Sequence, residues 1–178
     1  MLSDKRVKEA EANVKQYLAE GLLKKETNST AKEMYLENCD LSLATAQKLF
    51  SLESEQYKPY LWVIVSSYYA MFYAANAILL SSGYKIGDKI SHKVTSDALI
   101  VFVRNKLKKG FLEEYEDAQL DALELTSAKA DNLLESLDFE RKKRSKFQYR
   151  MDEEVKRTKA LTSLQRAKEF IFELKKLL

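Results

Sequence analysis

The sequence predicts an all-α protein, and two observations carry that prediction. Its 178 residues contain four glycines and one proline, and none of these helix breakers occurs after Gly110. The 26 positions from Pro59 to Tyr84 contain no charged residue, although charged residues make up 32% of the chain. We expect this stretch to be the central helix of an antiparallel up-and-down bundle of about five to six helices, in a single domain over residues 1–178.

The uncharged stretch is also long enough to cross a bilayer, so a membrane span is the competing interpretation. Its middle carries hydroxyl and amide groups, which belong to Ser66, Ser67, Tyr68, Tyr69, Tyr73 and Asn76. These groups would need partners inside lipid, whereas the neighbouring helices of a protein core can supply them. We therefore favour a core helix, and no membrane association is expected.

Two amphipathic helices are expected before the central one. Residues 4–25 repeat apolar side chains at three- and four-residue spacing, at Val7, Ala10, Val14, Leu18 and Leu22. Thr30 and Glu33 have the spacing of a capping box, so a second helix should begin there. Its inward seam would be Leu36, Cys39, Leu43, Ala46 and Phe50, which makes Cys39 a small core residue rather than a nucleophile.

The central helix should begin near Pro59 and end near Gly83. One of its faces carries small side chains, at Ser66, Ala70, Ala74 and Ala77, which lets another helix approach closely. Residues 84–91 are then expected to form a loop. A fourth helix over about 93–109 would turn Val94, Ala98, Val101 and Phe102 inward.

A long fifth helix is expected from about 112 to 148, and a last helix over 153–178, capped by Asp152. The inward seam of the last helix would be Leu161, Leu164, Ala167, Ile171, Leu174 and Leu178. That of the fifth helix is Leu123, Ser127, Ala130, Leu134 and Leu137, and at the same spacing it reaches Arg141, Arg144 and Gln148. Either these arginines line a cleft or an interface, or the helix outruns the core and its seam becomes exposed.

Clustered basic residues are the main chemical signal, because the formal net charge of +3 does not by itself imply a polyanionic partner. Six cations occur within ten residues without an acid, at Arg141, Lys142, Lys143, Arg144, Lys146 and Arg150. A second group is Arg104, Lys106, Lys108 and Lys109. Such patches bind phosphates, and the alternative is a solvated helix face.

Other site chemistry finds little support in the sequence. A single histidine and a single cysteine on separate helices do not form a metal site, and no glycine-rich phosphate loop is present, so we expect neither a metal nor a cofactor. The N-terminus lacks the apolar core of a secretory signal, and the lone Cys39 cannot form an internal disulfide. A cytoplasmic location is the corresponding expectation.

Three stretches together resemble the HEPN family of small helical bundles. They are SSYYAMFYAANAILLSSGY at 66–84, which is similar to the family's central helix, ISHKV at 90–94, and RSKFQY at 144–149, followed by a final helix that contains Ala167 and Phe170. The resemblance extends in order and spacing over about residues 4–178. It implies a helical bundle that commonly dimerises, and a connection to nucleic acids, since many members are RNases paired with a minimal nucleotidyltransferase as antitoxin.

The active residues of that family are an arginine followed four to six residues later by a histidine, and this chain matches only in part. Arg144 corresponds to the arginine, but Tyr149 stands at the end of an Arg-x4-Tyr form, and no histidine follows Arg141 or Arg144. Metal-independent RNA cleavage needs a base for the 2′-hydroxyl and a cation for the phosphorane. Arg144 can supply the cation, and Tyr149 or His92, the only histidine, would have to supply the base.

Two functional hypotheses follow. In the first, the chain is an RNA-associated HEPN-type protein of a toxin–antitoxin or related defence system, in which Arg144 and Tyr149 border a groove and Arg141, Lys142, Lys143, Lys146 and Arg150 hold phosphates. In the second, it is a non-catalytic helical module that forms a homodimer and binds a partner protein such as a nucleotidyltransferase. The sequence leaves open whether the chain is an endoribonuclease.

Overall fold

The computed structural model describes the backbone of residues 2–108, 110–138 and 153–178, and the side chains of these residues except 127–138 and 153–155. The chain is mostly helical, with one short pair of strands. The elements in order are α1 (Asp4–Ala19), β1 (Leu23–Lys25), α2 (Ser29–Ser51), α3 (Tyr60–Ser81), β2 (Tyr84–Ile86), α4 (Ser91–Phe102), the 3₁₀ turn η1 (Arg104–Lys106), α5 (Phe111–Asp138) and α6 (Glu153–Lys175). The expected all-α class is thus confirmed in its main feature.

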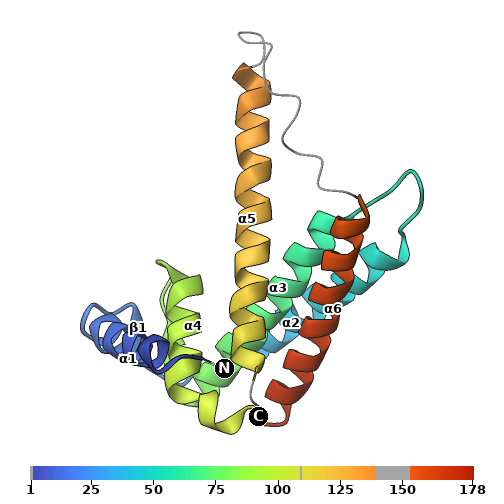
Figure 1. Ribbon diagram of the computed structural model, residues 1–178. Helices are drawn as coiled ribbons and strands as arrows, with labels where there is room; N and C mark the ends of the chain where they lie inside the picture. Colours follow the sequence, from blue (N-terminus) through green and yellow to red (C-terminus); the bar gives the residue numbers. More distant parts are fainter. Residues whose placement is uncertain (1, 109, 139–152) are drawn as a thin grey trace.

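Helix α3 is the centre of the bundle. It packs against α2, α6, α5 and α4, while α1 lies on the far side of α4 (Figure 1). Fourteen of its residues are buried, and the small side chains Ala70, Ala74 and Ala77 are among them. Among the described helices, α3 alone is long and apolar enough to span a membrane, and 72% of its most apolar window is buried within the fold. This burial is that of a core helix.

The strand pair was not expected from the sequence. Residues 23–25 were assigned to the first helix and 84–86 to a loop, but Leu23 pairs with Ile86 and Lys25 with Tyr84 in an antiparallel ladder. Gly21 ends the first helical segment early, because its φ of +72° lies in the left-handed region. Gly87 donates its N–H to Leu22 O at 2.8 Å, and this bond closes the end of the ladder.

Two of the expected helix boundaries are shifted. Asn28, rather than Thr30, caps α2, since its side chain accepts a hydrogen bond of 2.9 Å from the N–H of Ala31. The fourth helix starts at Ser91 and ends at Phe102, well before residue 109, and the 3₁₀ turn η1 follows it. Pro59 and Gly83 flank α3 as expected, and Gly83 has a φ of +88°.

Most of the expected inward seams are buried. Val7, Ala10 and Val14 of α1, Cys39 and Ala46 of α2, Val94 and Ala98 of α4, and Leu164, Ala167, Ile171 and Leu174 of α6 are all in the core. Leu161 and Leu178 are each 47% exposed, so the ends of the α6 seam were wrong. The predicted cap Asp152 lies outside the described residues.

The described part of helix α5 buries residues that the sequence did not single out, and the expected seam is wrong at Leu123. The buried stripe consists of Leu112, Tyr115, Ala118 and Ala122, which pack toward α3 and α6. Leu123, the first residue of the expected seam, is 44% exposed, and Leu120 beside it is 65% exposed. The second half of α5 rises above the other helices (Figure 1). The side chains of Ser127, Ala130, Leu134 and Leu137 lie outside the described part of the chain.

Candidate functional site

Most of the candidate site residues lie outside the described residues. Arg141, Lys142, Lys143, Arg144, Lys146, Tyr149 and Arg150 all fall in the segment 139–152. His92 is the member of the expected site that the structure places. Of the second basic group, Arg104 and Lys106 belong to η1 and Lys108 follows it.

His92 sits in the first turn of α4, among aromatic side chains of α3. Its Nδ1 lies 2.7 Å from the Tyr68 hydroxyl. Its ring centroid lies 4.6 Å from that of Phe72 and 5.8 Å from that of Tyr69, in an edge-to-face arrangement with the latter. Ile90, the residue before α4, has a φ of +45° and provides no side-chain cap. The interactions of His92 therefore join the start of α4 to the middle of the core helix.

The electrostatics of this contact favour a neutral imidazole. Burial lowers the pKa of His92 below its ordinary value. Burial also raises the pKa of Tyr68, so its phenol keeps its proton at neutral pH. A Tyr68 hydroxyl that donates to Nδ1 places the ring hydrogen on Nε2, and Nε2 is then a donor rather than a base. The contact thus supports a positioning role for His92 more than the general-base role considered from the sequence.

Tyr68 also packs against a second buried phenol. Tyr115 of α5 packs on Tyr68 with ring centroids 6.0 Å apart, and on Phe170 of α6 at 5.3 Å. The Tyr115 hydroxyl has no hydrogen-bond partner among the described residues. Burial raises the pKa of Tyr115 well above its ordinary value, which keeps this group neutral as well. The His92 contact therefore rests on a rigid aromatic layer shared by α3, α5 and α6.

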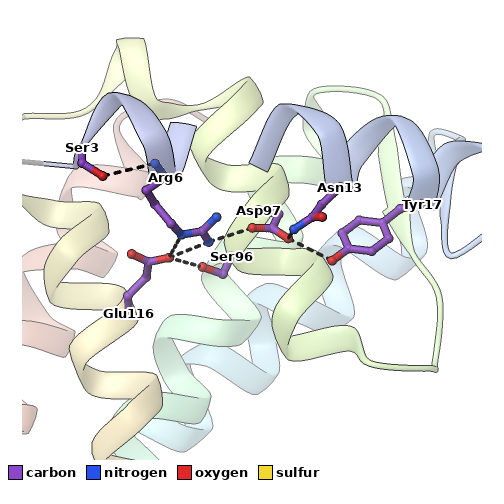
Figure 2. Close-up of polar contacts among 7 residues, drawn as sticks. All are labelled: Ser3, Arg6, Asn13, Tyr17, Ser96, Asp97 and Glu116. Carbon is purple, nitrogen blue, oxygen red and sulfur yellow. Dashed lines mark hydrogen bonds and ion pairs between the residues drawn. The ribbon is translucent and has the colours of Figure 1, made fainter. Parts of the chain in front are cut away.

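A second polar assembly, the Asp97 cluster, joins α1 to α4 and α5 (Figure 2). Its members are Arg6, Asn13, Tyr17, Ser96, Asp97 and Glu116. Asp97, with a fully buried side chain, accepts from Asn13 at 3.0 Å and Tyr17 at 2.9 Å, and pairs with Arg6 Nη2 at 2.7 Å. Arg6 Nη2 lies 2.7 Å from Glu116 as well, and Ser96 donates to that carboxylate at 3.0 Å.

The charged groups of the Asp97 cluster stabilise one another and hold α1 against α4 and α5. Burial acts to lower the pKa of Arg6, but hydrogen bonds to Glu116 and Asp97 outweigh it, and the pKa is raised. Burial and then the hydrogen bond to Asp97 raise the pKa of Tyr17. Each group thus keeps the protonation state that its partners require. Because the Asp97 carboxylate is buried and engaged on both oxygens, it is poorly placed to act on a substrate.

The Asp97 cluster was not expected from the sequence, although one feature of α4 indicates it. Asp97 is the only charged residue between Val94 and Val103, in the part of α4 that is buried. A lone acid on a buried helix needs a donor from a neighbouring element. That donor is Arg6, which lies 91 positions away in the sequence. Its position beside Asp97 depends on how α1 docks on α4, and apolar periodicity does not specify this docking.

An open pocket of about 410 Å³ lies where η1 meets the start of α5. Arg104 and Lys108 line it together with Asp4 and Glu113, and Leu112 forms part of its apolar wall. Lys108 is already paired with Glu173 of α6 at 3.1 Å. With cations and carboxylates in equal number on its wall, the pocket shows no clear preference for an anion.

No group of three or more metal-binding side chains occurs among the described residues. No protein-family model, curated protein or solved structure matches the chain.

Proposed function

We propose that this chain is a HEPN-like helical protein that associates with RNA. The observation that carries the proposal is the basic segment 141–150, in which six cations occur without an acid. A dense array of this kind binds phosphates by displacing condensed counterions. The all-helical architecture around an uncharged core helix is compatible with the resemblance drawn from the motifs.

The proposed chemistry needs no metal. If the protein cleaves RNA, a base takes the proton of the 2′-hydroxyl and its oxygen forms a bond to the adjacent phosphorus. The bond from phosphorus to the 5′-oxygen breaks, that oxygen takes up a proton from an acid, and a 2′,3′-cyclic phosphate remains. Arg144 would stabilise the charge on the phosphorane, and Tyr149 is the candidate for proton transfer. A tyrosine needs neighbouring cations to lower its pKa for this task, and Lys146 and Arg150 flank Tyr149 in the sequence.

Purified protein tests this proposal with two separate measurements. Fluorescence anisotropy with a labelled single-stranded RNA at low salt measures association, and gel analysis of the same RNA measures cleavage. We expect binding that weakens steeply with salt and that is reduced in Arg144→Ala. Cleavage that persists unchanged in both Arg144→Ala and Tyr149→Phe would show a contaminating nuclease. Absence of binding by the wild type at low salt would overturn the proposal.

The second candidate function is that of an interaction module, and the exposed leucines of α5 favour it. Leu120 and Leu123 are three residues apart on one face, and they are 65% and 44% exposed. Neighbouring aliphatic side chains on an exposed helix face offer apolar surface that a partner can bury. We propose a second copy of the chain as that partner, and a minimal nucleotidyltransferase, suggested by the resemblance, as the alternative.

Light scattering tests the dimer directly. We expect a dimer at micromolar concentration that dissociates in a Leu120→Glu and Leu123→Glu double variant. Leu161→Glu is a matched control, because Leu161 is exposed to a similar extent on α6. A wild-type monomer throughout that range, or a dimer that Leu161→Glu disrupts equally, would exclude the α5 stripe as the interface.

A further inference from the structure

Aromatic side chains of α2, α3 and α4 lie close to one another around the middle of α3, and Trp62 stands two turns earlier on the same helix. We refer to six side chains as the aromatic face. They are Tyr35 on α2, Trp62, Tyr69, Phe72 and Tyr73 on α3, and His92 on α4. Ring contacts connect most of its members. Tyr73 stacks on Tyr35 with centroids 6.3 Å apart and lies 6.1 Å from Tyr69, which in turn contacts Phe72 and His92.

The aromatic face is accessible at two positions along α3. Trp62 is 53% exposed and Tyr69 38% exposed, and their separation of seven residues places them on one side of the helix. Phe72, Tyr73, Tyr35 and His92 are half-buried beside them. Tyr68, which is 1% exposed, lies beneath and holds His92 in place. The exposed rings are thus presented on a fixed support rather than on a mobile loop.

Lysines stand at one margin of this face. Its α3 part carries no charge of either sign, because residues 59–84 are uncharged. Lys89 and Lys93, both exposed, flank His92 in the chain. Near Tyr35, Lys85 pairs with Glu26 at 2.7 Å, Asp88 is a further carboxylate, and Glu33 and Glu37 are exposed on α2 beside Tyr35 in the sequence. Lys89 and Lys93 thus place two exposed ammonium groups at the α4 margin of the face.

The composition of the face distinguishes it from the aliphatic stripe of α5. Leu120 and Leu123 offer surface that a protein partner would bury. The aromatic face instead offers flat rings, which include three phenols with hydroxyl groups and the only tryptophan. Rings beside cations are the arrangement that binds single-stranded nucleic acid, because each base can stack on a side chain while the phosphates remain near lysines.

We propose that the aromatic face binds unpaired bases of single-stranded RNA, with Tyr69 and Trp62 as stacking platforms and Lys89 and Lys93 near the phosphates. This inference rests on the proposed association with RNA, and it locates a base-binding surface on α3, away from the basic segment in sequence. A duplex of the same length should bind less well there, because its bases are already stacked on one another.

Trp62 provides a direct readout because it is the only tryptophan in the chain. We expect a 12-nucleotide single-stranded RNA to quench its fluorescence, and the same RNA annealed to its complement to quench it far less. By anisotropy, Tyr69→Leu should weaken single-strand binding about tenfold, since leucine keeps the apolar volume but cannot stack, while Tyr69→Phe should bind as the wild type does. Phe172→Leu is the control, because Phe172 is a 63% exposed aromatic residue on α6.

The outcomes separate this inference from the proposed function. Quenching together with selective loss in Tyr69→Leu supports the aromatic face. If the wild type binds RNA but Tyr69→Leu and Trp62→Leu bind it equally well, the face is not a base-binding surface, and association through the basic segment stands. A change of oligomeric state in Tyr69→Leu without a change in RNA affinity would assign the face to a second copy and overturn the inference.

Failure of the wild type to bind RNA would overturn both this inference and the proposed function. Trp62→Leu also serves as the second variant, should Tyr69→Leu not fold.

Discussion

Arg6 of α1 and Asp97 of α4 form an ion pair of 2.7 Å, in which the aspartate side chain is fully buried and the arginine side chain is 25% exposed. Asn13 and Tyr17, also on α1, donate to the second oxygen of the same carboxylate. The polar contacts of one helix thus converge on a single residue of its neighbour. Since α1 packs mainly on α4, this residue controls the docking of the N-terminal helix.

We expect Asp97→Asn to lower the free energy of unfolding by about 2 kcal/mol at pH 7, because hydrogen bonds to a charged acceptor are stronger than those to an amide. The amide would also bring its own donors against Asn13 and Tyr17. Urea denaturation followed by circular dichroism measures the change. Asp117→Asn is the matched control, because the Asp117 side chain is 59% exposed and lies 3.5 Å from Arg166, and it should cost less than about 0.5 kcal/mol. Equal losses in the two variants would contradict the role of burial.

The contact of His92 predicts a dependence of stability on pH. Its pKa in the folded protein is lowered by burial, so the unfolded chain binds a proton more readily. The stability that the neutral ring contributes is therefore complete above the unfolded value of about 6.5 and is lost as the pH falls below it. We expect the wild type to lose more stability than His92→Gln between pH 7 and pH 5. Parallel slopes for the two proteins, measured as urea midpoints, would contradict this assignment.

Composition and apolar spacing were sufficient to predict the helices and most of their buried faces. The absence of charge from Pro59 to Tyr84 identified α3, and the spacing of Cys39 and Ala46 identified the buried side of α2. These signals are local, since a helix with one apolar stripe has one way to bury it. For α5 the spacing was wrong at Leu123, the member of the expected seam whose side chain is described, because the buried face there depends on contacts with α3 and α6.

The site was less accessible to sequence reasoning than the fold. His92 was a candidate because it is the only histidine, but its partner Tyr68 lies 24 positions earlier on another helix. The short ladder between residues 23–25 and 84–86 was missed for the same reason, since three-residue strands carry no usable periodicity and their pairing is non-local. Contacts between distant segments depend on the docking of whole helices, which no local pattern encodes.

Substitutions of Gly83 measure the cost of the positive φ at the end of α3. Its φ of +88° lies in the region that L-residues disfavour, and a Cβ added there would meet no atom within 4 Å. We therefore expect Gly83→Ala to lower the free energy of unfolding by about 1 kcal/mol through the backbone alone. Gly83→Asn should lose less, because asparagine tolerates this conformation better than alanine. If alanine and asparagine were equally destabilising, a steric cause rather than the backbone conformation would be indicated.

Cys39 offers a probe of the core that needs no added label. Its side chain is buried in α2, and burial raises the pKa of its thiol to about 11. Because the thiolate is the reactive form, the native protein at pH 8 should react with a disulfide reagent orders of magnitude more slowly than the urea-unfolded protein. The native rate should then follow the opening of the fold, and it should rise in Asp97→Asn if the loss of the α1 clamp lowers global stability. Rapid stoichiometric labelling of the native protein would show that α2 does not stay packed over Cys39 in solution.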